Sequence, residues 1–163
     1  MRLNTSAASV LTAFALVLSA CGDDSGTGPG VGFGTGSATV TGSVNTSFSG
    51  QATSGVDALT GLGTFAVTLT ETGGSNTLSV VFTAGRPGPG SYPIGTPSDA
   101  IYGEVGLTGL YESITGQVQI TSSTPDGIAG SATFTADRGT DVINVTTTFD
   151  ALCFPVPSLI VCS

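Results

Sequence analysis

The sequence predicts an all-β domain: a single antiparallel β-sandwich, or alternatively a closed β-barrel, of about seven to nine strands. From Ser37 onward, apolar residues recur at every second position, which is the period of a strand with one buried face. Glycine and β-branched residues dominate the same region, and no stretch of it combines helical periodicity with good helix formers. We favour the sandwich because many of the expected strands carry small residues, which suit a thin core.

Alternation defines the expected strands in the first part of the domain. Their inward faces are Ala38, Val40, Val44 and Phe48, in a first strand or hairpin interrupted at Gly42; Phe65, Val67 and Leu69; and Leu78, Val80, Phe82 and Ala84. Residues 72–76 form a hairpin connection between the second and third of these faces. Tyr92 and Ile94 predict a short strand, which Pro93 between them places at a sheet edge or a bulge. Residues 101–107 predict one further strand.

Residues 114–150 predict a three-stranded antiparallel meander. Its first turn is Thr124-Pro125-Asp126-Gly127, in which proline presets φ, aspartate caps the turn and glycine takes a positive φ. Residues 137–140 form the second turn. The expected inward faces are Ile114, Gly116, Val118 and Ile120; Ile128, Ala132, Phe134 and Ala136; and Ile143, Val145, Thr147 and Phe149.

The charge balance excludes polyanionic partners. The chain has 163 residues, a net charge of −8, three basic residues and no histidine. The basic residues are Arg2, Arg86 and Arg138, so eleven acidic residues and two arginines leave a net charge of −9 after residue 20. Nucleic-acid binding and electrostatic docking on anionic lipid both require a basic surface. We therefore expect no nucleic-acid partner.

The N-terminus has the pattern of an export signal. Arg2 supplies a positive charge, residues 7–18 form an apolar stretch too short to span a bilayer comfortably, and small residues then precede Cys21. Leu18-Ser19-Ala20-Cys21 resembles the lipobox of bacterial lipoproteins. The resemblance implies cleavage before Cys21, lipidation of its thiol, acylation of the new N-terminus and, because Gly22 rather than aspartate follows, an outer-membrane location. An ordinary secretory signal followed by a chance cysteine is the alternative.

We expect three segments in the chain. Residues 1–20 are a signal peptide, residues 21–36 are the lipidated cysteine with a glycine-rich tether, and residues 37–163 are the β-domain. The tether spans about 20 Å as a flexible chain. Once the first cysteine is assigned to lipid, Cys153 and Cys162 remain as an even pair in an exported chain, which predicts a disulfide. This disulfide would close the C-terminal tail and contribute about 2–3 kcal/mol.

Four segments of the domain together resemble a loose group of uncharacterised bacterial lipoproteins. The segments are residues 89–95, 114–121, 130–136 and 145–150, which match a PGxYxIG turn-strand, a GxVxIT strand, a GxFxFxA strand and a closing VTxGxF strand. Ala132 replaces the first aromatic residue of the third pattern, and Thr147 replaces the glycine of the fourth. The resemblance implies an exported β-domain and transfers no catalytic residue.

The residue types exclude the usual nucleophilic triads. The chain has no histidine, no lysine and no GxSxG motif, so a serine or cysteine nucleophile lacks its usual base. Paired carboxylates can hydrolyse glycosides, and Glu104 and Glu112 are the one pair that we nominate because they are the least turn-like acids. The alternative is that both are solvated. We expect a protein that is not an enzyme.

An acidic turn at Asp137, Gly139 and Asp141 is a candidate calcium site, because Ca²⁺ takes several oxygen ligands around a glycine turn. Arg138 in the middle of the turn opposes a cation, and no glutamate follows at EF-hand spacing. A solvated hairpin turn is the alternative. We expect no metal and no cofactor.

The tyrosines are clustered in the sequence. Tyr92, Tyr102 and Tyr111 form a candidate contact face for a sugar or a protein, since a tyrosine offers a large area and a polar group. The alternative is that they lie at the edge of the core under a Pro/Gly loop. We expect a non-enzymatic, lipid-anchored cell-envelope protein with an interaction or structural role, attached to the membrane by its anchor and contacting an envelope protein or glycan. A carbohydrate- or small-ligand-binding surface lipoprotein is the alternative function.

Overall fold

The computed structural model describes residues 32–56, 64–95 and 101–153, without the side chains of residues 101–104. These residues form nine β-strands and no helix, which confirms the all-β prediction. None of them therefore belongs to a helix long and apolar enough to cross a membrane. The strands are β1 (Gly34–Gly42), β2 (Thr46–Val56), β3 (Phe65–Glu71), β4 (Thr77–Phe82), β5 (Gly90–Gly95), β6 (Ile101–Gly106), β7 (Leu110–Thr124), β8 (Gly127–Arg138) and β9 (Asp141–Cys153).

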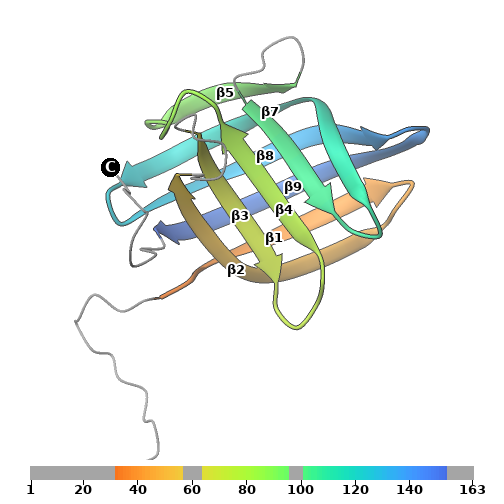
Figure 1. Ribbon diagram of the computed structural model, residues 1–163, viewed down its shortest axis with the longest axis horizontal. Helices are drawn as coiled ribbons and strands as arrows, with labels where there is room; N and C mark the ends of the chain where they lie inside the picture. Colours follow the sequence, from red (N-terminus) through yellow and green to blue (C-terminus); the bar gives the residue numbers. More distant parts are fainter. Residues whose placement is uncertain (1–31, 57–63, 96–100, 154–163) are drawn as a thin grey trace, which may run out of the picture. The chain divides into compact units, whose positions relative to one another are not determined.

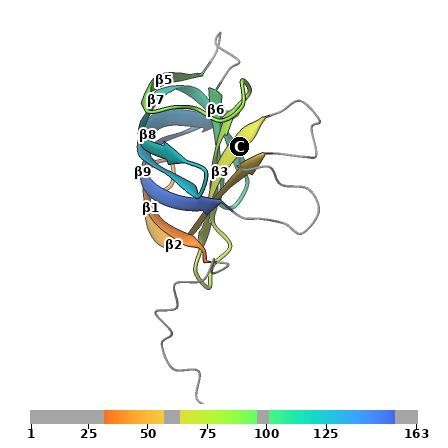
Figure 2. The ribbon, with the colours of Figure 1, turned by 90° about the vertical axis from the view of Figure 1, so that its left-hand side faces the viewer.

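Eight of the nine strands form a closed antiparallel barrel (Figure 1). Successive strands pair in the order β1-β2-β3-β4-β6-β7-β8-β9, and β9 then pairs with β1 along residues 35–42 and 143–150. Figure 2 shows β8, β9, β1 and β2 on one side of the barrel and β3 on the other. The preferred sandwich is therefore wrong and the barrel alternative is correct. The first strand is hydrogen-bonded on both sides, whereas an open sheet would leave it as an edge.

The ninth strand, β5, lies outside the circuit of the barrel. The long strand β7 shares one edge between two partners: residues 110–112 pair with β6, and residues 115–120 pair with β5. Pro93 lies in the middle of β5, opposite Gln117. Proline lacks the N–H that a central strand needs, so the structure confirms the edge position predicted for this segment.

Inward-facing side chains form one hydrophobic cluster inside the barrel. An eight-stranded barrel has an interior just wide enough for its own side chains to fill, and each large apolar side chain buried there contributes about 1.5–3 kcal/mol. Most predicted inward residues of β3, β4, β8 and β9 are buried as expected: Phe65, Val67, Leu69, Leu78, Val80, Phe82, Ile128, Ala132, Phe134, Ala136, Ile143, Val145, Thr147 and Phe149. Ala84 and Val44 instead lie in the connections beyond β4 and β1.

The predicted inward face of β7 is interrupted by a bulge. Val118 and Ile120 are buried, but Ile114 is 39% exposed. The pairing of β7 with β8 shifts register between Ser113 and Thr115. Because side chains alternate along a strand, one extra residue turns Ile114 away from the core. The prediction that Ile114 faces inward is therefore wrong.

The pairing of β1 with β9 also contains a buried polar side chain. Thr147 is 1% exposed and donates a hydrogen bond from its Oγ1 to the carbonyl oxygen of Ser37, at 2.8 Å. This bond satisfies the hydroxyl within the wall. β1 begins at Gly34, inside the segment expected to be tether, and the backbone of Gly34 approaches β9 so closely that a Cβ would meet the carbonyl oxygen of Asp150.

The barrel has two ends with different connections. The turn end carries four short connections between strands, at residues 43–45, 72–76, 107–109 and 139–140. The loop end carries the longer β4–β5 connection at residues 83–89 and the β7–β8 turn at residues 125–126. We use these two names below for the two ends.

Candidate functional site

The two acids nominated for catalysis occupy paired positions. Glu104 on β6 lies opposite Glu112 on β7, and Glu112 lies opposite Asp137 on β8. Glu112 is exposed and Asp137 is partly exposed on the outer surface, next to the turn end. Directly opposed residues of an antiparallel pair have Cβ atoms about 4.5–5.5 Å apart. The fold therefore brings these positions together along the strands, and Glu112 and Asp137 lie on the convex outer face of the barrel.

In the acidic turn, Arg138 forms an ion pair with Asp141. Arg138 donates a hydrogen bond from Nη2 to Oδ2 of Asp141 at 3.0 Å, and its guanidinium covers the ring of Tyr111. Gly139 has a φ of +67°, the left-handed conformation that this two-residue turn requires. Within residues 32–56, 64–95 and 105–153, no group of three acidic or cysteine side chains could hold a metal ion.

The three tyrosines do not form a common exposed face. Tyr111 is 0% exposed and belongs to the core, so its ring is not available to a ligand at the surface. Tyr92 is partly buried: its ring meets the edge of Phe82 with 5.8 Å between centroids, and its hydroxyl donates to the carbonyl oxygen of Gly88 at 2.7 Å. The side chain of Tyr102 lies outside the described part. Two of the three tyrosines therefore follow the core-edge alternative.

An arginine that the sequence analysis left without a role closes the loop end. Arg86 donates from Nη2 to the carbonyl oxygen of Gly127 at 2.8 Å and from Nε to Oγ of Ser123 at 3.1 Å. Its guanidinium also lies over the ring of Phe65. Burial lowers the pKa of Arg86 below its ordinary value, and the negative charge of Asp126 partly offsets this shift. The signal in the sequence that could have indicated this role is the isolated positive charge of Arg86 at the start of a segment rich in proline and glycine.

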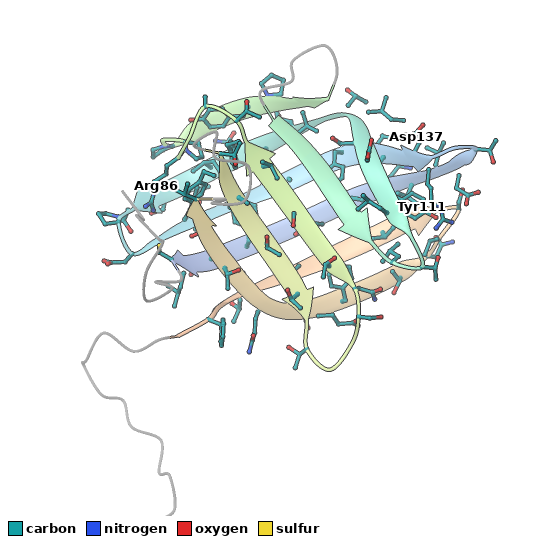
Figure 3. The ribbon with its side chains drawn as sticks, in the orientation of Figure 1. Arg86, Tyr111 and Asp137 are labelled. Carbon is teal, nitrogen blue, oxygen red and sulfur yellow. The ribbon has the colours of Figure 1, made fainter. Side chains whose placement is uncertain are left out.

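Arg86, Tyr111 and Asp137 are labelled in Figure 3, which places Arg86 at one end of the barrel and the other two at the opposite end.

At the loop end, Cys153 ends β9 and donates its backbone N–H to the carbonyl oxygen of Asp126 at 2.8 Å. Cys153 is disulfide-bonded. Cys162, its predicted partner, and Cys21, the predicted lipidation site, lie outside the described residues, so both assignments stay predictions.

The outer surface of neighbouring strands β2, β1, β9 and β8 carries rows of hydroxyl side chains, which we call the hydroxyl face. Cross-strand pairing aligns the outward residues of these strands. One row is Ser49, Ser37, Thr148 and Ser131, and the next row is Ser47, Thr39, Thr146 and Thr133. Each hydroxyl offers one donor and two acceptor sites, so the rows retain hydrogen-bonding capacity toward solvent.

Two adjoining shallow hollows lie on the hydroxyl face. The first measures about 380 Å³ and has Thr35, Ser37, Thr148 and Asp150 at its corners, above Gly36 and Phe149. The second measures about 440 Å³ and has Ser37, Thr39, Ser47 and Ser49 at its corners, above Ala38 and Phe48, with Glu71 and Thr72 beside it. Ser37 belongs to both hollows. Sequence reasoning missed them because they join β9 to β1 and β2, which are distant along the chain.

Comparison with known proteins found no relative of this chain. No protein-family model, curated protein or solved structure matches the chain. The chemistry of the chain therefore has to be argued from its own residues.

Proposed function

We propose that this protein is a non-enzymatic, lipid-anchored component of the bacterial cell envelope that acts through the outer surface of its barrel. The observation that carries the proposal is the occupied interior: among the described residues, the inward apolar side chains of the barrel strands form one hydrophobic cluster or pack against it. A barrel that carries a ligand needs interior space, whereas a barrel filled by its own side chains is a rigid scaffold. Contacts with partners then fall to the exterior.

The absence of usual catalytic residue types supports a role without catalysis. The chain has no histidine or lysine, and Glu112 lies exposed on the convex surface rather than in either of the two hollows. An acid that acts in glycoside hydrolysis is usually shielded from water, since burial is what raises its pKa for proton donation. The pair of Glu104 and Glu112 therefore serves as the negative control of this proposal.

The anchor rests on the lipobox-like segment that ends at Cys21. The acyl chains would hold the domain at the membrane, because a chain with three basic residues and a net charge of −8 is a poor match for anionic lipid. An interaction or structural role in the envelope follows from a folded domain that is fixed in place and exposes a polar exterior.

The test combines lipid labelling with crosslinking in cells. Wild-type protein and Cys21→Ser are expressed with an affinity tag, fed an alkyne fatty acid and fractionated, and crosslinked partners are identified by mass spectrometry. We expect label and membrane recovery for wild type only, together with an envelope component that crosslinks only to the anchored form. Equal labelling of both proteins, or hydrolysis of an envelope glycan that is abolished in Glu112→Gln, would overturn the proposal.

A further inference from the structure

The charged groups of the described residues are unevenly distributed over the barrel. The hydroxyl face carries serine and threonine across four strands, and the acids beside it are Asp150, at a corner of the first hollow, and Glu71, beside the second. Ser37 lies at the junction of the hollows, where its Oγ is 3.2 Å from Oγ1 of Thr148. In a chain with a net charge of −8, this surface is mostly neutral and rich in hydroxyl groups.

The pairing of strands explains the shape of both hollows. Outward side chains stand at the corners, and between them lies a cross-strand pair at inward-facing positions: Gly36, which has no side chain, opposite Phe149, and Ala38 opposite Phe48. The floor of each hollow therefore contains backbone rather than a protruding side chain. The corners are hydroxyl groups, except for the carboxylate of Asp150.

We propose that these two adjoining hollows bind a neutral polysaccharide, with consecutive sugar units lying across β9, β1 and β2. Sugar hydroxyls both donate and accept hydrogen bonds, as do the serine and threonine hydroxyls at the corners. Asp150 and Glu71 accept hydrogen bonds from sugar hydroxyls at the outer ends of the site. A carboxylate acceptor gives stronger hydrogen bonds than a neutral acceptor does.

The charge of the surface selects this occupant over others. An anionic glycan or a nucleic acid would meet the carboxylates of Asp150 and Glu71 with no opposing cation at the hollows. A stable protein partner would need an apolar anchor, because interface centres are enriched in aromatic and other large apolar residues. The corners of both hollows are small and polar.

Ser37 provides the sharpest test because it borders both hollows. Ser37→Arg places a long side chain at their junction, and Thr133→Arg places the same side chain on the exposed surface of β8, outside them. Asp150→Asn removes the carboxylate while keeping the size of the side chain. Both arginine variants add the same charge, so their comparison isolates position.

The experiment is native affinity electrophoresis of the acylated full-length product in a nonionic detergent. The gels contain dextran, starch, laminarin or galactomannan as neutral probes, and alginate as the anionic probe. We expect at least one neutral polysaccharide to retard wild type, with an affinity about tenfold lower in Ser37→Arg and within about twofold of wild type in Thr133→Arg. Asp150→Asn should also weaken binding, and thermal melts establish that each variant is folded.

Three outcomes would overturn the proposal: no retardation by any neutral probe, retardation by alginate alone, or equal losses in the two arginine variants. The inference rests on the proposed function, since it names the partner of the exposed barrel surface. Its failure is separable from failure of that function, because lipid labelling and membrane recovery do not depend on glycan binding. A protein that is anchored and crosslinked but not retarded would retain the envelope role and lose the glycan site.

Discussion

Arg138 holds its guanidinium over the ring of Tyr111, with 4.6 Å between the guanidinium carbon and the ring centroid. Arg86 makes the same kind of contact with Phe65 at the other end of the barrel, at 5.4 Å. A cation above an aromatic ring is attracted to the negative face of the ring quadrupole. After Arg2 the chain has only these two basic residues, and each covers an aromatic ring where the core approaches solvent.

Replacement of Arg138 should weaken the turn end. Arg138→Ala loses the contact with the ring of Tyr111, so we expect the free energy of unfolding to fall by about 0.5–1 kcal/mol. Asp141→Asn removes only the exposed ion pair and should lower it by less than about 0.5 kcal/mol. Urea denaturation measures both changes. Equal losses in the two variants would show that the ion pair, not the ring contact, is the stabilising interaction.

Removing the hydroxyl of Tyr111 should stabilise the protein. This oxygen is buried and has no hydrogen-bond partner, and an unsatisfied buried polar group costs about 1–3 kcal/mol. We expect Tyr111→Phe to raise the free energy of unfolding. Tyr92→Phe is the matched control, because the hydroxyl of Tyr92 donates a hydrogen bond to the carbonyl oxygen of Gly88. We expect this variant to lower the free energy of unfolding by about 0.5–1.5 kcal/mol. The same sign in both variants would contradict this account.

Arg86 should be the more important of the two arginines. Arg86→Ala removes charged hydrogen bonds to Gly127 and Ser123, so we expect a loss of about 1.5–3 kcal/mol. Arg86→Lys keeps the charge but cannot reproduce the planar fork of donors, and should recover less than half of the loss. Thermal and urea unfolding provide the comparison. Full recovery by lysine would mean that charge alone is needed at this position.

Close approach of two strands requires glycine at position 116. A Cβ there would lie 2.3 Å from Cβ of Phe134 on β8, so Gly116→Ala should destabilise by about 1–3 kcal/mol through overpacking. Gly88 is the control, because a Cβ at this glycine meets no atom within 4 Å. Gly88→Ala should change stability by less than about 0.5 kcal/mol. A similar loss in both variants would point to a general intolerance of the chain.

Strand positions and most inward faces could be predicted because they are local properties of the sequence. The alternation of Ile143, Val145, Thr147 and Phe149 specifies one face of β9 without reference to any other strand. Ile114 on β7 is the exception, and its cause is a β-bulge. The bulge beside Ile114 shifts the alternation by one residue, and no proline or glycine pair marks it in the sequence.

The choice between sandwich and barrel depends on pairing that is not local. Both architectures need the same alternation, and they differ in whether β1 meets β9. Part of β2 was also hard to predict, because its inward positions Gly50, Ala52 and Ser54 are small and form no run of large apolar residues. Their size suited a thin sandwich core equally well.

For the candidate sites too, the residue types could be read from the sequence, whereas their positions relative to one another depend on strand pairing. The residue types at positions 104 and 112 suggested a carboxylate pair, and only strand register showed that the two positions lie opposite each other. The tyrosine proposal failed for Tyr111 because exposure depends on which strand face a residue occupies. The hollows around Ser37 required three strands to be aligned, and two of them are more than a hundred residues apart in sequence.

The pairing of β1 with β9 has a consequence for the time at which the domain can fold. Residue 35 pairs with residue 150, so the wall stays open until nearly the whole domain has left the ribosome. Contacts that are so distant along the chain form late, since loop closure must precede them. For an exported chain of the kind that we propose, β1 keeps an unpaired edge during passage through the membrane. In such a chain, barrel assembly would wait until translocation is complete.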